Sequence, residues 1–123
     1  MRCAAGSRQD RGAWAERRAL ALLRRRGWRL LSRNWRCRWG ELDLVVAKPG
    51  RLLLVEVKGR GASSRDGAGV AALGARKRLR LRRAWSCWLA AHPDVAHLPV
   101  EQVAALVPLP PSRAPVRWIR LGA

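Results

Sequence analysis

The stretch from Gly40 to Arg60 reads GELDLVVAKPGRLLLVEVKGR, and the fold can be worked out from it. Two apolar runs, Glu41 to Ala47 and Arg51 to Lys58, flank a Lys48-Pro49-Gly50 turn signal. This pattern predicts two adjacent β-strands joined as a hairpin. L-Pro followed by Gly favours a type II turn, whereas tight hairpins prefer the primed types, so a connection wider than two residues stays open.

The acids of this stretch lie among apolar residues, and strand geometry predicts which faces they take. Alternate residues of a strand share a face. The expected groups are Glu41, Asp43 and Val45 on one face, Leu42, Leu44 and Val46 on the other, and Leu54, Glu56 and Lys58 together on the second strand. A two-residue turn sets Asp43 opposite Glu56 and Glu41 opposite Lys58, with Cβ atoms ~4.5–5.5 Å apart.

Two opposed carboxylates in a strand pair of Leu and Val repel each other and lose hydration. A cation is the natural compensation. Oxygen ligands without His or Cys suit Mg²⁺ or Mn²⁺.

The spacing of these residues carries a resemblance. Asp43, followed thirteen residues later by Glu56-Val57-Lys58, resembles the PD-(D/E)xK nuclease signature without its Pro. With Asn34, Gly40 to Leu44 and Val55 to Arg60, the chain resembles the bacterial YraN family, also called UPF0102, and more distantly the archaeal Holliday-junction resolvases. The resemblance implies an α/β restriction-endonuclease-like fold. Its central mixed β-sheet is flanked by helices in the order α-β-β-β-α-β.

The resemblance also implies roles for the acidic stretch. Asp43 and Glu56 would hold Mg²⁺ or Mn²⁺ with the Val57 carbonyl. Lys58 would position or activate the attacking water, and Glu41 would support the metal through water or pair with Lys58. The competing interpretation is a protein that binds nucleic acid without cleaving it, in which Glu56 forms a structural ion pair with Lys58 and Glu41 forms one with Arg60.

A helix is predicted from about Arg11 to Arg26, because Ala, Leu and Arg dominate this segment. Ala13, Glu16, Leu20 and Leu23 fall on one stripe, so Glu16 is expected to face inward. The helix dipole alone would also favour an acid there. Under the resemblance, Gly12 to Glu16 lies where the family has Gly-x-x-Gly-Glu, with Ala15 for the second Gly. Glu16 would then join the acidic cluster and hold the hydration shell of a second metal.

The charge balance indicates the partner. The 123 residues carry 26 Lys and Arg against 8 Asp and Glu, a net charge of +18. Such a surface attracts polyanions, and nucleic acid is the commonest polyanion in a cell. A codon bias toward Arg would explain Arg in place of Lys but not the excess of positive charge. We expect binding to nucleic acid, DNA in preference to RNA, with a basic RNA-associated structural protein as a further alternative.

A second helix is predicted from about Ala75 to Ala91, ending before Pro93. Its expected buried stripe consists of Leu81, Trp85, Trp88, Leu89 and His92. Basic residues crowd its first half, and those expected to contact nucleic acid are Arg76, Lys77, Arg78 and Arg80, together with Arg60. Lys77 matches a family Lys and is the preferred backbone contact, whereas a solvated basic face is the alternative.

The remaining segments complete one predicted domain, residues 11–123, after a disordered tail at residues 1–10. A first strand is expected at Trp28 to Trp35 and a mobile loop at residues 59–69. Residues 99–107 and 116–121 could both be edge strands. The resemblance weakens in this divergent part, about residues 93–123, where Glu101 stands in place of a family Asp.

Other residue types narrow the functional classes. Trp35 and Trp39 either fill the core or stack on bases. Three widely spaced Cys and two His make a zinc site improbable, and free thiols fit the cytoplasm. No apolar run reaches membrane-spanning length, so no membrane partner is expected. A homodimer stays open.

Overall fold

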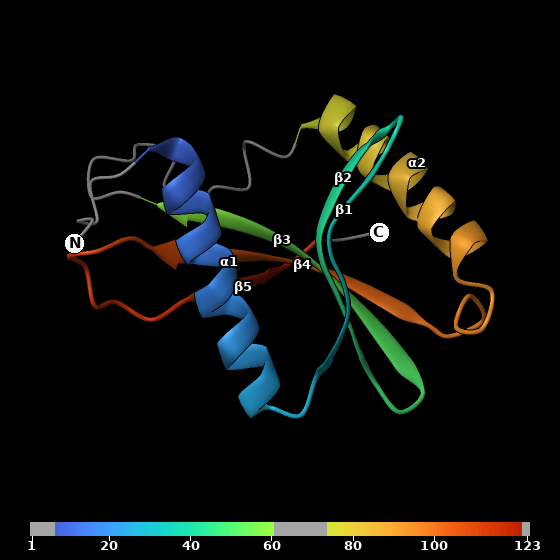
Figure 1. Cartoon of the computed structure of the whole chain (residues 1–123), viewed down its shortest axis with the longest axis horizontal. Coiled ribbons are helices and arrows are strands. Elements are labelled where there is room, and N and C mark those ends of the chain that lie inside the picture. The colour runs from blue at the N-terminus through green and yellow to red at the C-terminus, as the bar shows by residue number, and fades with distance from the viewer. Residues whose placement is uncertain (1–6, 61–73, 122–123) are drawn as a thin grey trace.

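The computed structural model describes residues 7–60 and 74–121 (Figure 1). The elements are α1 (Arg8–Arg25), β1 (Arg29–Cys37), β2 (Gly40–Lys48), β3 (Arg51–Arg60), α2 (Ala75–Ala91), β4 (Val100–Pro108) and β5 (Arg117–Arg120). The strands form a five-stranded sheet in the order β1-β2-β3-β4-β5. Strands β3 and β4 are parallel, and the other neighbours are antiparallel. The predicted α/β class with a mixed sheet is confirmed.

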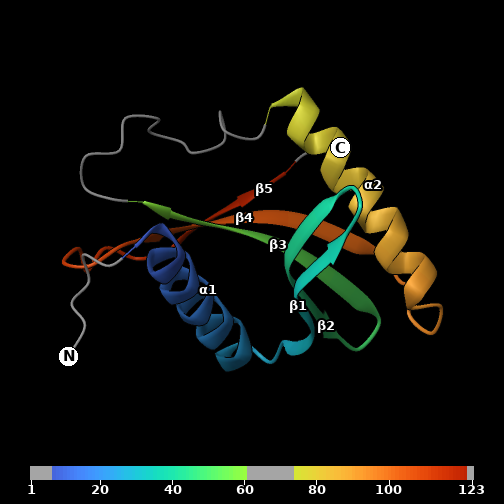
Figure 2. The same ribbon diagram turned by 45° about the horizontal axis from the view of Figure 1, so that its top comes forward.

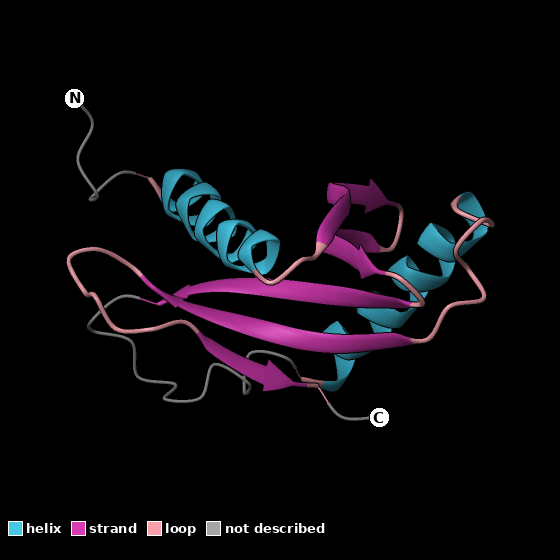
Figure 3. Ribbon diagram, turned by 90° about the horizontal axis from the view of Figure 1, so that it is seen from below, coloured by secondary structure: helices cyan, strands magenta, loops and turns pink. Residues whose placement is uncertain are grey.

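The two helices cover opposite faces of the sheet, and Figure 2 shows the sheet lying between them. Helix α1 packs Ala15, Ala19, Leu20 and Leu23 against one face. Helix α2 packs Leu81, Ala84, Trp85 and Trp88 against the other. In Figure 3 the β1–β2 end of the sheet is turned away from the long strands, as strand twist requires.

Trp88 anchors α2 to the sheet. Its side chain is fully buried, and its ring stacks at 5.0 Å from Trp85 and 3.9 Å from His92. The indole Nε1 donates a hydrogen bond of 2.9 Å to Ser32 Oγ in β1, so the buried polar atom is satisfied. The bounds predicted for this helix are confirmed. Of its predicted stripe, Leu89 and His92 are only half-buried.

The hairpin between β2 and β3 has the predicted two-residue turn. Lys48 pairs with Arg51, and Leu44 pairs with Val55, as the predicted register requires. Gly50 has φ of 84°, the value that the third position of a type II turn needs and that glycine adopts without strain.

The predicted faces of β2 are wrong at Leu42. This residue packs with Val45 in the core beneath α2, whereas Leu44 packs beneath α1. The alternation of faces therefore changes at Asp43. On the neighbouring strand the change occurs at Asn34, whose φ of 51° lies in the left-handed region that Asn tolerates better than most residues.

Helix α1 begins three residues earlier than predicted, at Arg8. Ser7 caps it: the Ser7 side chain accepts from the Asp10 N–H, and the Asp10 side chain accepts from the Ser7 N–H. This capping box satisfies two otherwise unpaired backbone donors, which explains why residues 8–10 are not part of a tail. The rest of the predicted tail, residues 1–6, lies outside the described residues. Ala13 is exposed, so the buried stripe is rotated relative to the predicted one.

Replacing Ser7 by alanine is expected to lower the free energy of unfolding by about 1 kcal/mol, because the Asp10 N–H loses its acceptor. Urea denaturation of the purified variant measures this loss. Ser86→Ala, at an exposed position within α2, is the control and should cause no comparable loss. Equal effects of the two substitutions would contradict the capping role.

Of the two predicted edge strands, only β5 is an edge. Strand β4 lies between β3 and β5, and its residues Ala104, Ala105, Leu106 and Val107 are buried. Four consecutive apolar residues suit an interior strand that is covered on both faces. The predicted loop at residues 59–69 falls almost wholly within residues 61–73, outside the described part of the chain.

Candidate functional site

An open pocket of about 640 Å³ lies where β2 and β3 meet the amino-terminal half of α2. We call it the carboxylate pocket. Its lining consists of Trp39, Gly40, Glu41, Asp43, Glu56, Val57, Lys58, Arg76, Lys77, Arg80 and Leu81. Most of the residues predicted for the site are therefore brought together by the fold.

Asp43 lies where the β2–β3 ladder ends. The last ladder pair is Leu44 with Val55, and beyond it Asp43 Oδ2 accepts a hydrogen bond of 2.8 Å from the Val57 N–H. Burial raises the pKa of Asp43 to about 6, against the opposing effect of the Val57 hydrogen bond. The charges of Glu16 and Glu41 raise this pKa further, whereas the charge of Lys77 lowers it.

Glu56 is the more strongly perturbed acid. Burial, followed by the charge of Asp43, raises the pKa of Glu56 to about 8, and Lys77 opposes this increase. Its Oε2 atom is buried and has no hydrogen-bond partner among residues 7–60 and 74–121. An unpaired carboxylate oxygen costs free energy when it is buried, and such exceptions are few in folded proteins. This oxygen is the feature of the pocket that most clearly calls for a ligand.

The wall of the pocket opposite the acids is basic. Arg76, Lys77 and Arg80 are exposed side chains of α2, and Lys58 is an exposed side chain of β3. Lys77 acts electrostatically on both Asp43 and Glu56, which supports its predicted place at the site.

Two further predicted contacts lie elsewhere. Arg78 lines a different groove on the other side of α2, and Arg60, at the end of β3, is outside the lining of the carboxylate pocket.

Glu41 does not stand directly opposite Lys58, contrary to the prediction, because the β2–β3 ladder ends at Leu44, three residues from Glu41. Instead Glu41 forms an ion pair with Arg36 of β1, at 2.5 Å between Nε and Oε2. It still lines the carboxylate pocket, and its charge raises the pKa values of Asp43 and Glu56.

Glu16 approaches the acidic cluster from α1 but is not part of the pocket lining. Burial raises its pKa, while a hydrogen bond with Asn34 and the charge of Arg33, whose Nε is 4.0 Å from Glu16 Oε1, lower it. Sequence reasoning missed both partners. Asn34 forms its hydrogen bond with Glu16 from a left-handed backbone conformation, and no periodic pattern in the sequence predicts that conformation.

Trp35 and Trp39, for which core packing and base stacking were the two predicted roles, are both half-buried against the core beneath α2. Trp35 belongs to the core beneath α2, with its ring centroid 6.4 Å from that of His92. Trp39 lines the carboxylate pocket, where the guanidinium groups of Arg38 and Arg83 lie 4.8 Å and 4.7 Å from its ring. Of these two tryptophans, only Trp39 borders the carboxylate pocket, so contact with a base remains an alternative for Trp39 and not for Trp35.

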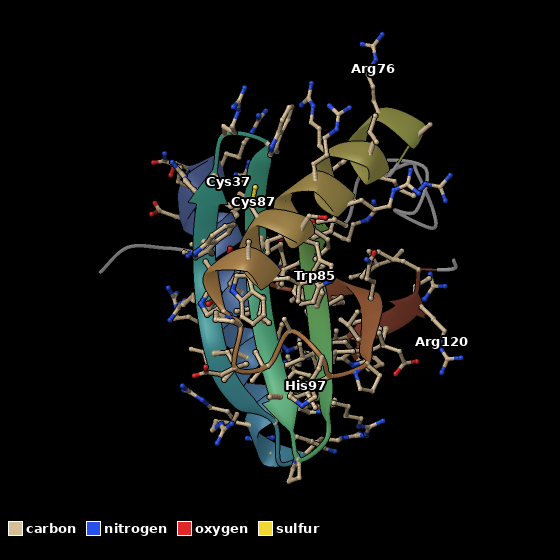
Figure 4. The ribbon with its side chains drawn as sticks, turned by 90° about the vertical axis from the view of Figure 1, so that its right-hand side faces the viewer. Cys37, Arg76, Trp85, Cys87, His97 and Arg120 are labelled. Atoms are coloured by element: carbon tan, nitrogen blue, oxygen red, sulfur yellow. The ribbon has the colours of Figure 1, made fainter. Side chains whose placement is uncertain are left out.

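Glu101 takes no part in the pocket. It lies beside Leu53 in the β3–β4 ladder and forms an ion pair of 2.8 Å with Arg120. Both residues lie on the β5 side of the molecule, where Figure 4 shows Arg120 far from Arg76. A role for Glu101 in place of a family Asp at this pocket is therefore excluded.

The acids of the pocket suit a hard divalent cation. Among residues 7–60 and 74–121, no three His, Cys, Asp or Glu side chains lie close enough together to hold a metal ion. Mg²⁺ usually takes only one or two protein carboxylates and completes its shell with water and substrate phosphates. Asp43 and Glu56, with the unpaired Glu56 oxygen, fit such a site.

These features define a class: a small basic α/β protein in which two half-buried acids, Asp43 and Glu56, face a basic helix across an open pocket. Residues 15–106 match the profile of the uncharacterised protein family UPF0102, and the chain belongs to this family. The resemblance to UPF0102 is thereby confirmed. In the described residues, neither helix is long and apolar enough to cross a membrane.

Relatives of the chain carry the same family name. A UPF0102 protein of Prochlorococcus marinus (strain MIT 9303) is 56% identical over 111 residues, covering 90% of this chain and 88% of the relative. One of Synechococcus sp. (strain CC9902) is 52% identical over 113 residues, 92% and 93% of the two chains. One of Halorhodospira halophila is 46% identical over 92 residues, 75% of each chain.

Proposed function

We propose that this protein is a metal-dependent endonuclease that hydrolyses phosphodiester bonds in DNA, structured or branched DNA included. The observation that carries the proposal is the buried, unpaired Oε2 of Glu56 next to the Asp43 carboxylate. A bound Mg²⁺ or Mn²⁺ would supply the missing partner of this oxygen and remove the repulsion between the two acids. The resemblance of Asp43 and Glu56-Val57-Lys58 to the PD-(D/E)xK signature supports the same reading.

The basic wall supports a nucleic-acid substrate. Arg76, Lys77 and Arg80 line the pocket within one helical segment, and the whole chain carries a net charge of +18. A phosphate drawn to this wall would lie between the basic helix and the two acids. Cys37 and Cys87 are free thiols, and they lie side by side in Figure 4. Because neighbouring thiols stay reduced in a reducing compartment, we place the protein in the cytoplasm.

The residues have distinct roles in the proposed reaction. Asp43 and Glu56 hold the cation, with the Val57 carbonyl as the third proposed protein ligand. When bound, the cation lowers the pKa of a water molecule and neutralises charge on the phosphate. Lys58 extends from the same strand as Glu56, two residues further on, and stabilises charge that develops on the phosphate oxygens. Lys77 and Arg80 orient the phosphate, and Glu16 and Glu41 add negative charge that favours a cation at the pocket.

Titration of Mn²⁺ into the purified protein, followed by heat release, tests the proposal. We expect binding by the unmodified chain and its loss in Asp43→Asn, because the substitution removes a charged ligand while preserving shape. Asp94→Asn is the matched control: it removes the same charge at an exposed position between α2 and β4, and should bind Mn²⁺ normally.

Cleavage is followed in the same samples with a fluorescent four-way junction, a flap and a linear duplex. Metal-dependent cleavage of any of them by the unmodified chain, absent in Asp43→Asn, supports the nuclease and ranks its substrates. The competing function is a nucleic-acid-binding protein without catalysis. Salt-sensitive DNA binding without Mn²⁺ binding in either protein would favour that alternative.

A further inference from the structure

The amino-terminal half of α2 stands out as an exposed basic ridge. Six of the nine residues from Ala75 to Arg83 are Arg or Lys, and all six are exposed. No acidic residue occurs anywhere in the helix. Figure 4 shows Arg76 pointing away from the fold at the start of this helix. Repulsion among these charges disfavours the helix in isolation, and bound phosphates would relieve it.

The basic residues of this ridge divide between its two sides, and each side has its own groove. Arg76, Lys77 and Arg80 line the carboxylate pocket. Arg78 and Arg82 line a second groove of about 800 Å³, which we call the β5 groove. The β5 groove is also lined by Arg120 of β5 and by Glu101, which is paired with Arg120. Three arginines against one acid leave this groove positive.

We propose that the substrate is a B-form DNA duplex whose major groove receives the amino-terminal half of α2. An α-helix with its side chains is ~10–12 Å across, and the major groove of B-DNA is ~12 Å wide, with one phosphate backbone on each side. One backbone then lies along the carboxylate pocket and reaches the acids. The other backbone lies along the β5 groove and contacts Arg78 and Arg82.

This arrangement selects among nucleic acids. A single strand has one backbone and would occupy one groove at a time. An RNA duplex has a deep, narrow major groove that does not admit a helix. The inference rests on the proposed function for the role of the carboxylate pocket, but binding of a duplex across both grooves can be measured without cleavage.

The test uses Arg78→Gln with Arg82→Gln, which removes two charges from the β5 groove and none from the carboxylate pocket. Gln has a helix propensity close to that of Arg, so α2 should be retained. Arg24→Gln with Arg25→Gln is the matched control. It removes the same charge at exposed positions near the end of α1, on the other face of the sheet.

Affinities for a 16-base-pair DNA duplex, for one of its strands and for an RNA duplex of the same sequence are measured by fluorescence anisotropy in EDTA at several salt concentrations. We expect the β5-groove variant to bind the DNA duplex at least tenfold more weakly than the control variant does. Its slope of log affinity against log salt should fall by about two, because each phosphate contact contributes ~0.9. Its affinity for the single strand should match that of the control variant.

Equal weakening for duplex and single strand would overturn the inference, as would an RNA duplex bound as tightly as the DNA duplex, or no binding of any probe at low salt. Failure of the proposed nuclease is a separate result. A protein that prefers the DNA duplex in this way, yet neither binds Mn²⁺ nor cleaves, retains the duplex interface and loses the catalytic role.

Discussion

Replacing Lys58 by alanine is expected to slow metal-dependent phosphodiester cleavage by about 10²–10³-fold, while affinity for the same DNA changes by less than about threefold. Lys58 is exposed at the carboxylate pocket, on the strand that carries Glu56. In the proposed reaction, its ammonium group would stabilise charge that appears on the phosphate only during cleavage. It is one of 26 basic residues, so its share of ground-state attraction is small.

Single-turnover cleavage and equilibrium binding, measured on the same substrate, separate the two effects. Lys48→Ala is the matched control, because it removes the same charge at the far end of β2, where Lys48 lies 4.7 Å from the Trp28 ring. The control should cleave at the unmodified rate. If Lys58→Ala cleaves as fast as Lys48→Ala, Lys58 has no catalytic role.

Replacing Glu56 by glutamine is expected to make the metal-free protein more stable at alkaline pH. The pKa of Glu56 is raised from 4.5 to about 8 in the folded state. Protonation of Glu56 therefore contributes to the free energy of unfolding. This contribution is full below pH 4.5 and is lost as the pH rises from 4.5 through about 8. The increase in pKa corresponds to a contribution of at most about 5 kcal/mol to the free energy of unfolding. Glutamine cannot ionise and avoids this loss.

Guanidinium denaturation in EDTA at pH 5 and pH 9 measures the effect. The unmodified protein should lose several kcal/mol more between the two pH values than Glu56→Gln loses. Glu101→Gln is the control, since it removes a carboxylate of the neighbouring strand β4 that is ion-paired with Arg120 and does not line the carboxylate pocket. Its pH dependence should equal that of the unmodified protein. The same pH dependence in Glu56→Gln and the unmodified protein would contradict the assigned burial of Glu56.

Local pattern was sufficient to predict the hairpin. The period-two pattern and the Pro49-Gly50 turn determine the pairing of Leu44 with Val55, and the run of helix-forming residues determines α2. The interior position of β4 could not be predicted in this way. Its partner β3 precedes it by some forty residues of sequence, and parallel pairing at that separation leaves no local mark.

The site was predictable in its composition but not in its geometry. Asp43 and Glu56 line one pocket, although the β2–β3 ladder ends at Leu44 and Val55, before the predicted pair of Asp43 with Glu56. The charge of Lys77 acts on both acids. The change of face at Asn34 and Asp43 was not foreseen, because it depends on a positive φ that the sequence permits at Asn but does not demand. That change accompanies the placement of the Asp43 carboxylate against the Val57 N–H.

The handedness of the connection between β3 and β4 decides which face of the sheet α2 covers. These strands are parallel, and α2 lies in the segment that joins them. Such crossovers are right-handed in about 98% of cases, because right-twisted strands pack with a helix only in that sense. A mirror-image crossover with the same strand order would place the arginines of α2 on the face that α1 covers, across the sheet from Lys58. The handedness of L-amino acids thus determines that the basic helix and the two acids meet on one side.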